Sequence, residues 1–133
     1  MHDEPHIAER RIRRLLDERI RPVIYGPGAP LAVTAHHVDG EPIGVDEAEA
    51  ATFAPFSVVA ASCPDRGTTW FRMSGTGPPE MAGRRVEAVV DPGFVTGQVG
   101  FNAEGLVWRD GAPLHGLHPA RQWSLISADA QGG

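Results

Sequence analysis

The chain has 133 residues, which suits one domain with a hydrophobic core, and an ordinary apolar content of 41%. Its formal net charge of −5 argues against non-specific nucleic-acid binding, which depends on neutralising phosphates with basic side chains. Cys63 is the single cysteine, so an intramolecular disulfide is excluded. The chain has no apolar run as long as a membrane span, and its N-terminus is charged rather than signal-like. We therefore expect a cytoplasmic location, with neither nucleic acid nor a membrane as a partner.

The first expected element is an amphipathic helix over residues 5–21. Pro5 suits the first turn of a helix, and Pro22 is expected to end it. Apolar side chains recur every three or four residues along one face, at Ala8, Ile12, Leu15, Leu16 and Ile20. Two acid-before-base pairs four residues apart are expected on the exposed side, Glu9 with Arg13 and Asp17 with Arg21. We expect the apolar stripe to pack on the rest of the domain, with partner binding as the alternative.

Short strands are expected over most of the remaining chain. Runs of β-branched and aromatic residues bounded by Gly, Pro and Asp are typical of a sandwich or barrel. The expected strands cover residues 31–38, 41–45, 68–73, 85–91, 106–108, 112–114 and 124–127. Asp39-Gly40 predicts a turn, and Arg109-Asp110-Gly111 predicts a hairpin turn. Residues 46–51 fit either a short helix or an exposed loop.

Two histidine pairs raise the question of a metal site. Neighbouring residues on a strand point to opposite faces, so His36 and His37 cannot easily share one ion. His115 and His118 lie in a glycine-broken loop where both could turn inward, but no third ligand has a convincing spacing. We therefore expect these histidines to cap or bridge loops.

Catalytic groups are equally hard to find in the sequence. Ser62, Cys63 and Ser74 lack the flanking residues that mark an activated nucleophile. Asp91 follows one expected strand and Glu104 precedes another, and nothing in the sequence brings the two carboxylates together as an acid/base pair. We expect this chain to contribute no catalytic residue.

Trp70, Trp108 and Trp123 are the remaining candidates for a binding role. Each lies in a strand-like run beside other apolar residues, which favours a place in the core or at an interface. The alternative is a platform for stacking sugars, which requires exposed and coplanar rings.

Three segments of the chain carry a resemblance to a known family. They read ERRIRRLLDERIRPVIYGPGAPL, GTTWFRMSGTGPPEMAGRRVEAVVDPGF and FNAEGLVWRDGAPLHGLHPARQW. In this order they resemble the N-terminal region of the long bacterial and fungal-vacuolar α-mannosidases of glycoside hydrolase family 38. The resemblance implies a mainly β fold, a jelly-roll-like (galactose-binding-like) β-sandwich preceded by one N-terminal α-helix. Residues 1–22 would be the helix packed on the sandwich, 23–127 the sandwich, and 128–133 a flexible tail.

The resemblance also implies a function. The chain would be a non-catalytic accessory domain of an enzyme that hydrolyses terminal α-mannosides, with a scaffolding and interdomain-packing role. Zinc and the aspartate nucleophile would belong to a separate catalytic domain, so this chain would hold no cofactor. Its partners would be that catalytic domain or other subunits of the oligomer. The alternative is a free-standing carbohydrate-binding module that binds α-mannosides through exposed tryptophans. The candidate interdomain or sugar contacts are Thr68, Thr69, Trp70, Trp108, His118 and Trp123.

Overall fold

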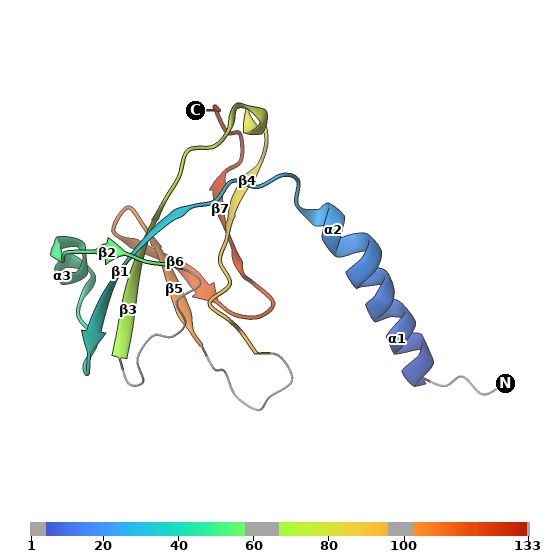
Figure 1. Cartoon of the computed structure of the whole chain (residues 1–133), viewed down its shortest axis with the longest axis horizontal. Coiled ribbons are helices and arrows are strands. Elements are labelled where there is room, and N and C mark those ends of the chain that lie inside the picture. Colours follow the sequence, from blue (N-terminus) through green and yellow to red (C-terminus); the bar gives the residue numbers. More distant parts are fainter. Residues whose placement is uncertain (1–4, 58–66, 96–102, 133) are drawn as a thin grey trace. The chain divides into compact units, whose positions relative to one another are not determined.

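The computed structural model describes residues 5–57, 67–95 and 103–132 (Figure 1). The chain divides into two compact units, residues 1–30 and residues 31–133. Ser62, Cys63 and residues 96–102 lie outside the described residues, so the expectations that concern them stay predictions.

The first unit is a helix that runs past Pro22. It consists of α1 (Pro5–Leu15), a π-helical turn η1 (Leu16–Ile20) and α2 (Arg21–Ile24). The prediction that Pro22 ends the helix is therefore wrong. Proline has no N–H, and its ring collides with the carbonyl four residues earlier. The preceding turn is widened, since the backbone N–H of Arg21 donates to the carbonyl of Leu16, five residues back, and Pro22 then lies in the first turn of α2.

Within the first unit, the helix leaves the apolar stripe uncovered. Ile12 is 59% exposed and Leu15 is 55% exposed. Its salt bridges in the described residues join Arg21 to Asp17 at 2.8 Å and Arg14 to Glu18 at 2.9 Å, whereas the expected pair of Glu9 with Arg13 does not form. None of the described helices is both long and apolar enough to cross a membrane.

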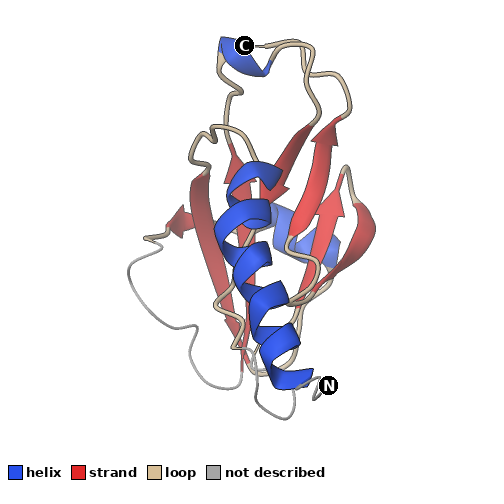
Figure 2. Cartoon of the chain, turned by 90° about the vertical axis from the view of Figure 1, so that its right-hand side faces the viewer, coloured by secondary structure: helices blue, strands red, loops and turns tan. Residues whose placement is uncertain are grey.

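The second unit is built mainly from strands (Figure 2). Its described strands are β1 (Ala32–Asp39), β2 (Ala54–Pro55), β3 (Gly67–Ser74), β4 (Val86–Val89), β5 (Gly105–Arg109), β6 (Ala112–Leu117) and β7 (Trp123–Ser127). They form three antiparallel sheets with the orders β2-β1-β3, β4-β7 and β5-β6. The prediction of a mainly β fold preceded by one N-terminal helical segment is confirmed.

The longest ladder joins β1 to β3. It contains eight residue pairs, from Ala32 opposite Ser74 to Asp39 opposite Gly67. Gly67 fits the end of this ladder because it lacks a side chain, since a Cβ atom there would lie only 2.4 Å from Cε1 of His37. The predicted turn after β1 is present, and Gly40 adopts the left-handed conformation with φ of 79°.

The expected strand over residues 41–45 is absent. The backbone bends after Asp39, and a short helix α3 (Val45–Ala50) begins where the strand was expected to end. Pro42 has no N–H for a strand ladder, and Asp46 and Glu47 favour the first turn of a helix. Of the two alternatives for residues 46–51, the helix is therefore the one that forms.

The β5–β6 hairpin turns as its sequence predicts. Asp110 and Gly111 both have positive φ, 52° and 73°, as a two-residue type I′ turn requires. The guanidinium of Arg109 donates to the carbonyl of Leu125 and so ties this hairpin to β7 in another sheet. Ala130, in the stretch expected to be a flexible tail, hydrogen-bonds through its N–H to Arg84 and through its carbonyl to Gly83.

Aromatic side chains pack beside the β2-β1-β3 sheet. The rings of Phe56 and Phe71 meet edge to face with centroids 5.1 Å apart. The guanidinium carbon of Arg72 lies 4.2 Å from the centroid of Phe53, whose ring also lies 5.9 Å from that of His36. These contacts place Phe53 and Phe56 at half-buried positions beside the sheet.

Candidate functional site

The Thr68-Thr69-Trp70 segment lies on β3, where all three side chains are half-buried. Thr69 is opposite His37 in the ladder, and its hydroxyl is hydrogen-bonded to Nδ1 of His37 at 2.9 Å. The other ring nitrogen of His37, Nε2, lies 3.1 Å from a carboxylate oxygen of Asp39. A row of hydroxyl, imidazole and carboxylate therefore spans the two strands.

This row has the residue types of a nucleophilic triad, but its surroundings favour a structural link. The carboxylate of Asp39 is 95% exposed, so nothing holds it in a desolvated position. Sequence reasoning missed the contact of His37 with Thr69, since the strand partner was unknown. The spacing of His37 and Asp39, two residues apart on one strand face, was a signal that could have suggested their pairing.

Trp70 and Trp108 pack against each other. Their ring centroids are 6.4 Å apart and their planes are inclined by 49°, and both side chains are half-buried. The indole Nε1 of Trp70 is buried and has no hydrogen-bond partner among the described residues. This geometry is that of an aromatic packing pair, and it differs from an exposed coplanar platform.

Trp123, at the start of β7, is half-buried and lies near two arginines. The guanidinium carbon of Arg85 is 5.7 Å from the ring centroid, and that of Arg121 is 5.3 Å away. Arg85 also forms a salt bridge with Glu87 at 2.6 Å. The cation–π contacts occupy the surroundings of the ring that a stacked sugar would need, so they favour packing over sugar stacking at Trp123.

His118 bridges a loop, whereas His115 lies on β6 and not in the loop that the sequence predicted. The backbone of His118 pairs with that of Arg121 through two hydrogen bonds, of 3.2 Å and 2.7 Å, and its Nδ1 accepts the N–H of Ala120. Nδ1 of His115 lies 3.0 Å from the carbonyl of Gly116. In the described ranges, no three His, Cys, Asp or Glu side chains come close enough together to hold a metal ion.

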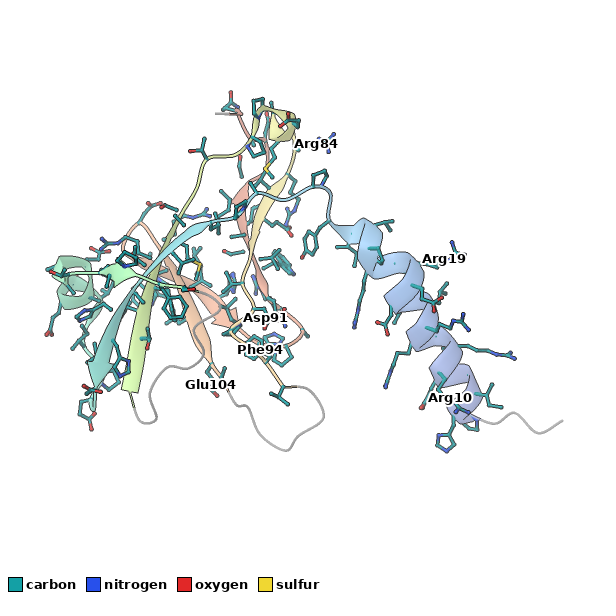
Figure 3. The ribbon with its side chains drawn as sticks, viewed as in Figure 1. Arg10, Arg19, Arg84, Asp91, Phe94 and Glu104 are labelled. Atoms are coloured by element: carbon teal, nitrogen blue, oxygen red, sulfur yellow. The ribbon has the colours of Figure 1, made fainter. Side chains whose placement is uncertain are left out.

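Asp91 and Glu104, the two carboxylates considered as an acid/base pair, lie at different positions and have different surroundings (Figure 3). Asp91 follows β4 and accepts the backbone N–H groups of Gly93 and Phe94 at 2.9 Å and 3.2 Å, which shapes a turn. Glu104 lies just before β5, where it lines a hollow of about 190 Å³. We name this the hairpin-end hollow, lined by Ala103, Glu104, Gly105, Gly116, Leu117 and His118.

The comparisons with known proteins agree with this description. A family model described as "Alpha-mannosidase, jelly roll domain" matches residues 29–133. Alpha-mannosidase 2C1 from Homo sapiens is 32% identical over 101 residues, which cover 76% of this chain and 9% of that protein. No solved structure gives a significant match. The resemblance to the N-terminal region of family 38 α-mannosidases is confirmed, and the chain belongs to the family of α-mannosidase jelly-roll domains.

Proposed function

We propose that this chain is a non-catalytic accessory domain that packs against the remaining polypeptide of an α-mannosidase acting on terminal α-mannosides. The observation that carries the proposal is the contrast between a small buried core and a large exposed apolar surface. Among the described residues of the second unit, Ala48 is the apolar residue that is buried, whereas eight large apolar residues are exposed.

The exposed apolar residues of the second unit include residues on three of its strands. Val89 of β4 is 52% exposed, Leu106 of β5 is 56% exposed and Ile126 of β7 is 51% exposed. Single exposed apolar residues are normal on a protein surface, but so many beside so small a core are typical of a domain that buries them against a partner.

A related protein contains enough further polypeptide to cover this apolar surface. The chain spans 9% of the length of its human relative, so most of an enzyme of that kind lies outside the matched region. In the proposal, the remaining polypeptide or other subunits of its oligomer cover the apolar surface. The catalytic aspartate and the zinc ion belong to that polypeptide, and the cytoplasmic location expected from the sequence is part of the same proposal.

The experiment removes the region of human Alpha-mannosidase 2C1 that matches this chain. Hydrolysis of a chromogenic α-mannoside and the sedimentation coefficient are measured for the intact and the shortened protein. The proposal predicts that the shortened protein loses hydrolysis or no longer assembles as the intact protein does. Unchanged hydrolysis and unchanged assembly would overturn it.

A further inference from the structure

The hairpin-end hollow combines groups that suit a small neutral ligand. It lies where Gly105 of β5 faces Leu117 of β6, next to Glu104 and His118. Its volume of about 190 Å³ is below the range of roughly 300–1,000 Å³ that is usual for drug-sized ligands, so it has room for one small ring. Leu117 supplies an apolar wall, and the two glycines leave the space free of side chains.

The polar groups of the hollow are complementary in their hydrogen bonding. Nδ1 of His118 accepts the N–H of Ala120 at 3.2 Å, so the proton of the neutral ring is on Nε2, which is left as a donor. The carboxylate of Glu104 makes no hydrogen bond or ion pair with the residues that the structure describes, and it is an acceptor only. A donor and a charged acceptor in one hollow match a ligand with several hydroxyl groups.

The charge of Glu104 narrows the class of ligand. A phosphate or a carboxylate would meet the negative charge of this carboxylate, so an anionic ligand is disfavoured. A metal ion would find only one carboxylate and one imidazole, fewer than the three protein ligands usual for zinc. We propose that the hairpin-end hollow binds a neutral sugar residue, with Glu104 accepting hydrogen bonds from its hydroxyls and His118 donating one.

This site differs from the tryptophan platform, since it contains no aromatic ring apart from the imidazole of His118. The hollow is also separate from the docking surface, because none of the residues that line it is among the exposed large apolar residues. Only the probe, methyl α-D-mannopyranoside, is chosen from the family to which the chain belongs.

The test is a titration of the full chain with this probe, followed by the backbone amide signals of Gly105 and Gly116 in NMR spectra. We expect saturable shifts with a Kd on the order of 1–10 mM, as befits a ligand of this size in an open site. Glu104→Gln should weaken binding about fivefold, because a neutral amide accepts weaker hydrogen bonds than a carboxylate. Glu80→Gln, on the 3-10 turn η2 (Pro79–Met81), is the matched control and should bind like the unchanged chain.

A second variant, Gly116→Leu, tests the hollow without the risk that a loss of binding comes from unfolding. At Gly116, an added Cβ would have its nearest neighbour at 3.7 Å, an ordinary contact, so Gly116→Leu should fold and fill the hollow. It should abolish the shifts. The proposal is overturned if the folded chain shows no shift at about 100 mM probe, well above the expected Kd. It is also overturned if both variants bind like the unchanged chain, or if the shifts occur at the tryptophan indoles instead.

Discussion

Gly67 should be one of the least replaceable residues of the sheet, because its missing side chain makes room for His37. A Cβ atom at this position would lie 2.4 Å from Cε1 and 2.7 Å from Nε2 of His37, and 2.7 Å from the carbonyl oxygen of Val38. The imidazole is held in place by Thr69 and Asp39, and the carbonyl belongs to the backbone of β1. Gly67→Ala must therefore displace the histidine, the strand or both.

The expected loss of stability in Gly67→Ala follows from the usual penalty for adding atoms to a packed site. Such changes lower the free energy of unfolding by about 1–3 kcal/mol. For a chain of 133 residues, this corresponds to a fall in Tm of roughly 4–12 °C. Thermal unfolding followed by circular dichroism is the assay. Gly77→Ala is the control, because the nearest atom to its added Cβ would be Sδ of Met81 at 3.7 Å, and it should leave Tm unchanged or slightly raised.

A double variant identifies the source of the cost. His37→Ala removes the imidazole that makes two of the three close contacts, so its effect and that of Gly67→Ala should be less than additive. If Gly67→Ala unfolds at the same temperature as Gly77→Ala, the close approach of Gly67 to His37 is refuted. If the effects of the two changes on stability simply add, the loss in Gly67→Ala comes from the carbonyl of Val38 instead.

Three further changes test other parts of the second unit by urea unfolding. Arg109→Met should cost about 1.5–3 kcal/mol, because it removes the charged donor that joins β5 to Leu125 in β7, and an unchanged midpoint would contradict that link. Ala48→Leu should lower the free energy of unfolding by about 1–3 kcal/mol, because Ala48 is only 2% exposed and the larger side chain overfills its site. An unchanged free energy of unfolding would show that the site has room for the larger side chain. Asp110→Val should cost about 1–2 kcal/mol at a φ of 52°, whereas Asp110→Gly should be tolerated, and equal stability of the two would argue against the left-handed turn.

Local chemistry explains the parts of the fold that the sequence predicts. Asp110-Gly111 adopts positive φ with little strain, so the hairpin is encoded in two neighbouring residues. The β-branched and aromatic run of β3 identifies its strand in the same way. Where two local signals compete, prediction fails: Pro22 is a helix breaker, but the π-helical turn before it lets the helix continue to Ile24.

The contacts of the candidate site depend on pairings that a single sequence does not reveal. The approach of Arg85 to Trp123 requires β4 to pair with β7, and these strands are separated by the whole β5–β6 hairpin. The contact of Trp70 with Trp108 likewise joins residues from two different sheets. The sequence identifies these residue types as candidates for packing, but their partners follow from tertiary structure.

The most direct test of the account compares three proteins in one α-mannoside hydrolysis assay. They are human Alpha-mannosidase 2C1, the same protein without the region that matches this chain, and the same protein with residues 29–133 of this chain in place of that region. If the chain is a docking domain, the shortened protein loses hydrolysis and the transplanted domain restores part of it. Hydrolysis by the shortened protein at the rate of the intact enzyme, with the same assembly, would contradict the account.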